Sequence, residues 1–207
     1  MSLPKPDAHG NPPALAPEDA RSLIQVARAS INHGFATDQP VDIEPLEFSN
    51  RLIRPAASFV TLNIAGQLRG CIGSVEARRP LVQDVAHNAF AAAFRDPRFP
   101  PLAETEFHPL EIHISVLGPP VPLSVESEEE LLKTLRPGVD GLILEESTFR
   151  SVFLPQVWDT LPEPAQFLEH LKLKAGLPAG YWSPQLRFRR FVVEEIGDDA
   201  EDRDLPA

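Results

Sequence analysis

The segment 58–73 constrains the fold more than any other part of the chain, because it predicts a β-hairpin. Residues 58–64 have the composition of a strand, and Gly66 permits a tight return into a second strand at 68–73. Alternation on that second strand places Arg69, Cys71 and Gly73 on one face and Leu68, Gly70 and Ile72 on the other. The hairpin therefore presents a guanidinium and the single cysteine of the chain on the same face.

Cys71 has two interpretations. About 6.6 Å separates alternate residues of a strand, so Arg69 can stabilise a thiolate electrostatically, while Gly70 and Gly73 let a ligand approach closely. In the alternative, Cys71 is a small buried apolar residue and the glycines serve packing, which is the commoner fate of a lone cysteine. A nucleophile also needs a base. His87 and His113 are both candidates, and the sequence fixes neither contact.

The remaining segments predict a mixed arrangement of helices and hairpins. They are a helix from Pro17 that Gly34 can end, a helix from Pro80, a strand at 111–117, a helix capped by Ser127 with Glu130, strands at 141–145 and 149–154, a helix from Pro164 ended by Gly176, and a final strand at 186–195. This irregular order is typical of the α+β class rather than a parallel βαβ array. We expect two subdomains within residues 17–196, the larger from about 17–120 plus 180–196 and the smaller from about 121–179.

Both ends have the composition of tails. Residues 1–16 hold four prolines and little apolar content, which predicts disorder. Residues 197–207 form an acidic tail, in which 198–204 carry −4 of the net charge of −11. That net charge argues against general binding to nucleic acid or to an anionic membrane. The chain has no apolar stretch of the ~20 residues that span a bilayer and no apolar signal core, so we expect a cytoplasmic protein, which the single cysteine also fits.

Motifs for cofactor chemistry are missing from the sequence. No phosphate-binding glycine loop, dinucleotide fingerprint or nucleophile elbow is present, so no cofactor is expected. The six histidines lack a dense ligand motif and one cysteine cannot build a thiolate zinc site, so no metal is expected either. Asp96-Pro97-Arg98 is typical of a turn, since Pro97 disfavours helix at Asp96. Arg98 is nevertheless suited to bidentate binding of an anion.

The hexapeptide 68–73 resembles the signature of the AMMECR-type domain family, also called AmmeMemoRadiSam system protein A. Further segments match the family in the same order: Asn88 and the alanines after it, Asp96–Leu102, Glu111–Leu117, Gly141-Leu142, Leu154–Val157 and Lys174–Leu177. Together they cover about residues 20–195. The resemblance implies a two-part α+β fold of unestablished biochemical activity, with Memo-like and radical-SAM proteins as partners. It also adds Asp96 and Arg98 to the candidate site, because their segment accompanies the hexapeptide.

One departure from the family bears on mechanism. Relatives often carry a second cysteine just before the segment 174–177, where this chain has Leu171-Lys172-Leu173. A two-cysteine mechanism is therefore not expected. Two hypotheses remain: the chain binds a small ligand or a protein partner in a cleft near Leu68–Gly73, or it is a cysteine-dependent enzyme that acts on a small anionic substrate with Cys71 as nucleophile and His87 as base.

Overall fold

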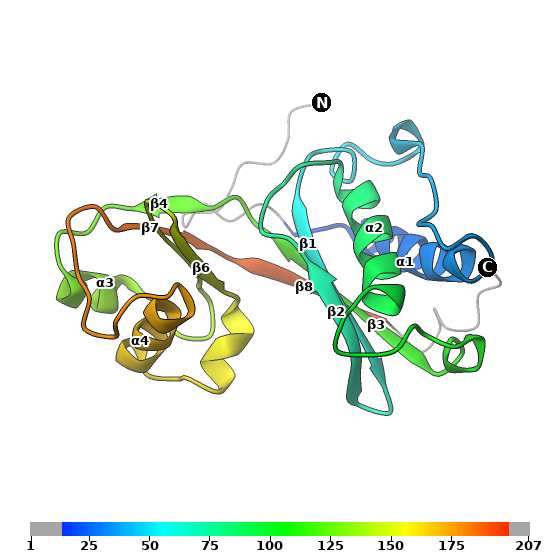
Figure 1. Cartoon of the computed structure of the whole chain (residues 1–207). Coiled ribbons are helices and arrows are strands. Elements are labelled where there is room, and N and C mark those ends of the chain that lie inside the picture. Colours follow the sequence, from blue (N-terminus) through cyan, green and yellow to red (C-terminus); the bar gives the residue numbers. More distant parts are fainter. Residues whose placement is uncertain (1–13, 199–207) are drawn as a thin grey trace. The chain divides into compact units, whose positions relative to one another are not determined.

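The structure, a computed structural model, describes residues 14–198, which divide into two compact units. The larger unit comprises residues 14–117 and 194–198, and the smaller comprises 118–193. Four α-helices and two four-stranded sheets make up the described chain (Figure 1). The α+β class predicted from the sequence is confirmed.

The sheet of the larger unit is built around the predicted hairpin. Its strands are β1 (Ala57–Ile64), β2 (Gln67–Gly73), β3 (Leu110–Leu117) and β8 (Val193–Gly197), in the order β2-β1-β3-β8. β1 pairs antiparallel with both β2 and β3. Ala65 and Gly66 connect β1 to β2 with positive φ angles of 50° and 74°, the signs of a type I′ turn, whose twist suits a two-residue hairpin. β2 is consequently an edge strand.

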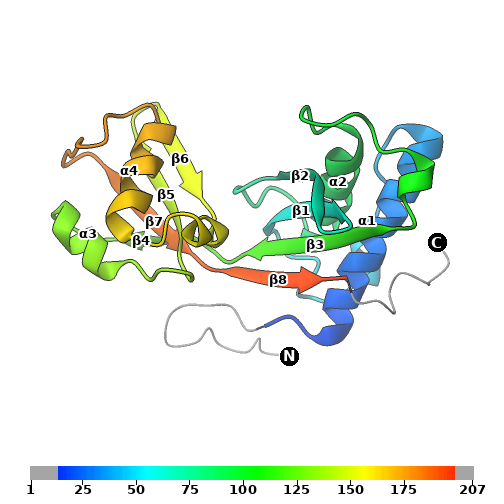
Figure 2. The ribbon, with the colours of Figure 1, turned by 90° about the horizontal axis from the view of Figure 1, so that it is seen from below.

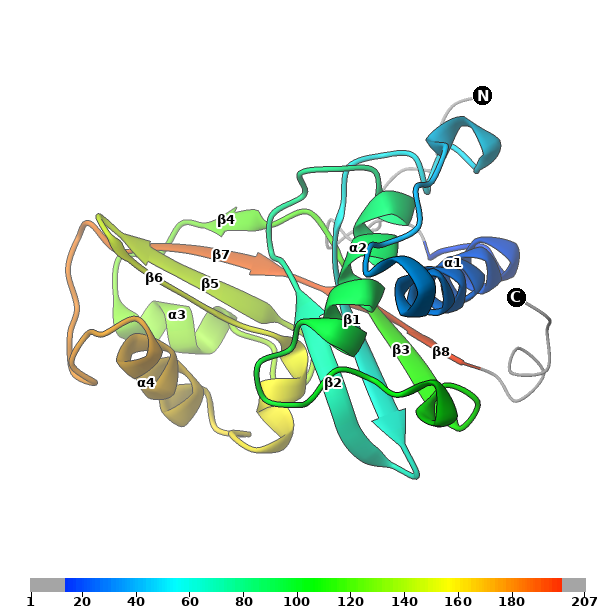
Figure 3. The same ribbon diagram turned by 45° about the vertical axis from the view of Figure 1, so that its right-hand side comes forward.

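Two helices cover one face of this sheet, α1 (Pro17–Thr37) and α2 (Leu81–Phe94) (Figure 3). The covered face alternates with the polar one along each strand, so Val60, Leu62 and Ile112 are buried with the apolar faces of both helices. Gly34 does not end α1 as predicted, because the helix continues to Thr37. A Cβ atom at Gly34 would lie 2.5 Å from the Phe94 ring, so this glycine permits close contact between the helices.

The smaller unit repeats the same plan with other elements. Its strands are β4 (Val121–Leu123), β5 (Gly141–Glu146), β6 (Phe149–Phe153) and β7 (Arg187–Phe191), in the order β4-β7-β5-β6. The helices α3 (Glu128–Thr134) and α4 (Pro164–Lys174) lie on one face of this sheet (Figure 2). Leu142, Leu144 and Phe188 pack there against Phe167 and Leu171. Glu145 of β5 and its neighbours Arg187 and Arg189 of β7 therefore lie on the opposite face.

The C-terminal segment differs from the expectation. Residues 186–195 were expected to form one strand of the first sheet, but β7 belongs to the smaller sheet and only β8 joins the larger one. The residues 180–193 accordingly belong to the smaller unit. Phe188 lies opposite Leu144 in the β5–β7 pairing and adds to the smaller core. Val192 interrupts the segment between the strands, and its carbonyl accepts a hydrogen bond from the Gly118 N–H.

Residues at both predicted tails are part of the larger unit. Leu15 is buried, and its N–H donates to a Glu194 carboxylate oxygen at 2.5 Å. Asp198 is also buried. Its ion pair with Arg28 compensates its charge inside the fold. The remainder of the two predicted tails, 1–13 and 199–207, lies outside the described residues. Among residues 14–198, no helix has both the length and the apolar character needed to cross a membrane.

Candidate functional site

Cys71 lies in β2 and is held by side chains from two other segments. It is half-buried, and the Thr61 hydroxyl of β1 donates to its Sγ at 3.3 Å. Its N–H donates to Asp96 Oδ2 at 2.9 Å, and its carbonyl oxygen accepts from Arg98 Nη2 at 3.1 Å. The segment after α2 therefore satisfies both backbone polar groups of Cys71 at the edge of the sheet, where unpaired groups would otherwise invite another strand.

Asp96 and Arg98 form a closed pair. The Asp96 side chain is 2% exposed and accepts from Arg98 Nε at 2.9 Å and from Arg98 Nη2 at 2.6 Å. These hydrogen bonds, helped by the N–H of Cys71, hold the pKa of Asp96 well below its usual range and raise the pKa of Arg98. The bidentate capacity of Arg98 is therefore engaged by Asp96, although half of its side chain remains exposed.

Arg69 pairs with a different acid. Its Nε and Nη2 donate to the two carboxylate oxygens of Glu106 at 2.8 and 2.9 Å, and Nη2 also reaches the Pro101 carbonyl at 3.3 Å. The hydrogen bond from Arg69 lowers the pKa of Glu106 and raises that of Arg69. The centroid of the Phe99 ring lies 5.9 Å from the guanidinium carbon of Arg69 and 5.5 Å from that of Arg98. Both guanidiniums thus contact one aromatic ring.

A β-bulge explains why Arg69 and Cys71 have different partners. The β1–β2 register pairs Leu62 with Gly70 but Asn63 with Leu68, so Arg69 has no residue opposite it. Such an extra residue locally redirects its side chain. Strand alternation alone predicted a shared face for guanidinium and thiol; in the structure the thiol contacts Thr61 while the guanidinium contacts Glu106.

The two glycines of the hexapeptide are closely packed by the protein itself. A Cβ atom at Gly70 would lie 2.2 Å from the Ala92 carbonyl oxygen of α2, and one at Gly73 would lie 2.3 Å from the Phe59 ring. Helix α2 therefore approaches β2 through Gly70. The space that a ligand would need at these two Cα atoms is filled by α2 and β1, so the structure accounts for both glycines without a ligand.

The two candidate bases lie on different sides of the sheet. His87 is exposed on α2, which covers the face opposite Cys71, and desolvation together with the Arg79 charge lowers its pKa. His113 and Cys71 both lie opposite Thr61, on β3 and β2, so the three side chains share one face. Two strand spacings separate Cys71 from His113, about 10 Å. Within residues 14–198, no hydrogen bond joins Cys71 to either imidazole.

A buried polar network occupies the helix-covered side. The Asp84 carboxylate of α2 accepts from the Ser58 hydroxyl at 2.7 Å, the Ser58 N–H at 3.0 Å and Asn88 at 2.9 Å. Burial raises the pKa of Asp84 despite these donors. Because the carboxylate already has three short partners, we interpret it as a tie between α2 and β1. No group of three or more His, Cys, Asp or Glu side chains in the described residues is arranged to hold a metal ion.

Comparison with known proteins decides the relationship of this chain. The sequence model of the AMMECR1 family matches residues 24–196, which include β2 and every residue that contacts Cys71 and Arg69 in the structure. The chain belongs to the AMMECR1 family.

Its AMMECR1-family relatives are similar along almost their full length. A protein of Methanothermobacter thermautotrophicus is 36% identical over 191 residues, which cover 89% of this chain and 97% of the relative. A protein of Methanopyrus kandleri is 34% identical over 205 residues, or 92% and 96% of the two chains. The crystal structure of an uncharacterized protein from Pyrococcus horikoshii superposes with a TM-score of 0.77 at 32% identity, over 87% of this chain and 92% of that one. These similarities support the fold.

Sequence reasoning missed several residues that shape this AMMECR1-family site. Glu106 pairs with Arg69 from 37 positions along the chain, Thr61 donates to Cys71 across the hairpin, and Phe99 contacts both guanidiniums. The hairpin register could have indicated Thr61, because a two-residue turn fixes which residues lie opposite each other. No local signal could have indicated Glu106.

Proposed function

We propose that this AMMECR1-family chain is a binding protein that recognises a partner protein at the β2 edge, defined as β2 together with residues 96–106. The observation that carries the proposal is that the reactive groups already have partners within the protein. Thr61, Asp96 and Arg98 engage the thiol and backbone of Cys71, and Asp96 and Glu106 engage both guanidiniums. Cys71 then contributes packing, and a small anion would have to compete with two carboxylates.

The surface of the β2 edge favours a protein partner over a small ligand. Leu68 is 44% exposed, and Pro97, Pro100 and Pro101 of the same β2 edge are also exposed. The prolines restrict the backbone, and the Arg69–Glu106 ion pair and the hydrogen bonds of Asp96 and Arg98 to the Cys71 backbone fix the segment to β2. Little conformational entropy is therefore lost when a partner binds. Exposed apolar and arginine side chains on a rigid support are typical of recognition surfaces.

The resemblance noted above supplies candidate partners, the Memo-like and radical-SAM proteins. We propose them as partners in the cytoplasm, a setting that the single cysteine supports. The test is isothermal titration calorimetry with each purified candidate from the same organism. Leu68→Ser should weaken binding about tenfold. Leu46→Ser is the matched control, because Leu46 is also an exposed leucine of the larger unit, at 84% exposure, and lies outside the β2 edge. Absence of binding by both candidates, or equal loss in the two variants, would contradict the proposal.

The alternative is a cysteine-dependent enzyme, and its supporting observation is the hydrogen bond that Thr61 donates to Sγ, which orients the thiol. Reaction of Cys71 with iodoacetamide at neutral pH distinguishes the two functions. The binding function predicts alkylation no faster than that of a model thiol, because Cys71 is half-buried and has no hydrogen-bonded imidazole among residues 14–198. It also predicts that Cys71→Ser keeps partner affinity within about twofold. Fast alkylation together with normal melting of Cys71→Ser and Cys71→Ala would instead favour the enzyme.

A further inference from the structure

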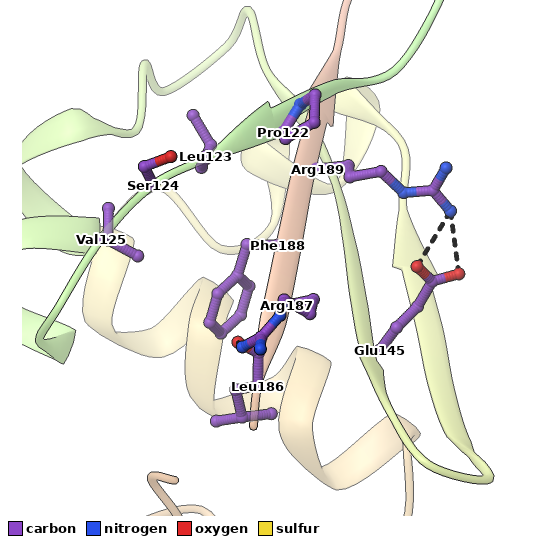
Figure 4. A pocket seen from close by; sticks show the side chains of 9 residues that line it. All are labelled: Pro122, Leu123, Ser124, Val125, Glu145, Leu186, Arg187, Phe188 and Arg189. Atoms are coloured by element: carbon purple, nitrogen blue, oxygen red, sulfur yellow. Dashed lines mark hydrogen bonds and ion pairs between the residues drawn. The ribbon is translucent and has the colours of Figure 1, made fainter. Parts of the chain in front are cut away.

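A pocket of about 480 Å³ opens in the smaller unit where β4 ends beside β7 (Figure 4). β4 pairs with β7 only as far as Leu123, opposite Phe188, and the chain then leaves the sheet. The position next to Arg187 on β7 is therefore not filled by β4. The apolar lining consists of Leu123, Val125, Leu186 and Phe188. This volume falls within the range of small-molecule sites.

The polar lining of this β4–β7 pocket is positively charged. Arg187 and Arg189 contribute from β7 and Glu145 from β5. Arg189 Nη2 contacts both oxygens of Glu145 at 2.9 Å, as the dashed lines in Figure 4 mark. Arg150 Nε of β6 also reaches Glu145, at 3.0 Å. One carboxylate is thus shared by two guanidiniums.

Arg187 differs from its neighbours. Its Nη1 donates only to the carbonyl oxygens of Pro184 and Leu186, at 2.8 and 3.0 Å. It has no carboxylate partner in the part of the chain that the structure describes, although Glu145 lies opposite it in the β5–β7 register. Its charge therefore remains available to a ligand. Arg150, Arg187 and Arg189 together with Glu145 give a local charge of about +2, in a chain of net charge −11. Such a local excess concentrates anions at one place on an acidic protein.

We propose that the β4–β7 pocket binds a small organic oxyanion, a carboxylate or a phosphate monoester, that carries an apolar group. Arg187 holds the oxyanion, because a guanidinium offers paired donors that match carboxylate and phosphate oxygens. The apolar group packs against Leu186 and Phe188. This site is separate from the β2 edge and does not depend on the function proposed for it.

Nuclear magnetic resonance of the full chain tests the proposal through its two tryptophan indole signals. The Trp182 ring stacks on Phe188 with centroids 5.7 Å apart. Trp158 stacks on Phe167 and donates its indole N–H to the Asp140 carbonyl. Phenyl phosphate and benzoate are the probes for the two anion classes. We expect at least one of them to shift the Trp182 signal saturably, with a Kd on the order of millimolar, while the Trp158 signal stays in place.

Two further probes and two variants separate this site from nonspecific binding. Inorganic phosphate should bind about tenfold more weakly than the best probe, and neutral benzyl alcohol should not shift the Trp182 signal. Arg187→Gln should weaken binding about tenfold or more. Arg150→Gln is the control, because Arg150 also pairs with Glu145 but does not line the pocket; the loss of its charge should weaken binding of the probe by no more than about threefold. The proposal is overturned if neither aromatic anion shifts Trp182, if benzyl alcohol or inorganic phosphate binds as well, or if both variants behave alike.

Discussion

The β2 edge and the β4–β7 pocket both carry arginines, but they use them differently. At the β2 edge each guanidinium has its own acid, Glu106 for Arg69 and Asp96 for Arg98. In the pocket one carboxylate serves Arg150 and Arg189, and Arg187 has only carbonyl partners in the described structure. The conspicuous sequence motif thus marks a region whose charges are internally compensated. The arginine without a carboxylate partner in the described structure, Arg187, lies outside the segments that carry the family resemblance.

The contrast between the two regions requires that the acids of the β2 edge contribute to the stability of the fold. Asp96→Ala removes the acceptor of the Cys71 N–H and of Arg98, so it should lower the free energy of unfolding by about 3 kcal/mol. Urea denaturation followed by circular dichroism measures this loss. Glu104→Ala is the control, because Glu104 is an exposed acid of the same segment, and its change should stay within about 0.5 kcal/mol. If Asp96→Ala lowers the free energy of unfolding as little as the control does, the Asp96–Arg98 pair does not stabilise the β2 edge.

A second measurement tests whether the hexapeptide glycines serve packing. Gly70→Ala places a Cβ atom 2.2 Å from the Ala92 carbonyl oxygen, so α2 must shift and stability should fall by about 2 kcal/mol. The matched control is Gly180→Ala, since a Cβ atom there meets nothing within 4 Å. Both midpoints come from the same urea titration. Equal stability of the two variants would mean that Gly70 is not required for contact between α2 and β2.

Acid should weaken the β2 edge in a defined direction. The pKa of Asp96 is lowered in the folded state, so the unfolded chain binds more protons and stability rises with pH. This contribution is complete above the ordinary carboxyl pKa of about 4 and is lost as the pH falls below it. Asp96→Asn should therefore show a shallower loss of stability between about pH 5 and pH 3 than the wild type. Asp84→Asn should not flatten this loss, because burial raises the pKa of Asp84. Parallel wild-type and Asp96→Asn curves would contradict the assignment.

The smallest expected change in stability comes from the acid of the pocket. Glu145→Gln removes a partly exposed partner of Arg150 and Arg189, so the free energy of unfolding should change by less than about 1 kcal/mol. The same variant increases the cationic excess, so the Kd for the better aromatic anion should decrease about threefold. The NMR titration measures this affinity. Weaker binding by Glu145→Gln would indicate that the carboxylate itself contacts the ligand.

Local patterns predicted the elements from which both regions are built. Alternation and Gly66 indicated the hairpin, and Pro164 and Gly176 bracketed α4, because backbone preferences and periodic burial act within a few residues. The segment 186–195 also had the composition of a strand. Its division into β7 and β8 depends on which sheet provides each residue with a pairing partner. Those partners, such as Leu144 opposite Phe188, are distant in the sequence.

The sequence by itself determined the family, the α+β class and the strand that carries Cys71. Only the tertiary structure decided what surrounds that strand. The pairing of Arg69 with Glu106 and the position of α2 against Gly70 join residues far apart along the chain. The bulge that separates Arg69 from Cys71 interrupts the regular register of the hairpin. Such contacts depend on the register and packing of whole elements, which periodicity and residue type do not specify. For the same reason, the uncompensated charge of Arg187 became visible only once β4, β5 and β7 were placed side by side.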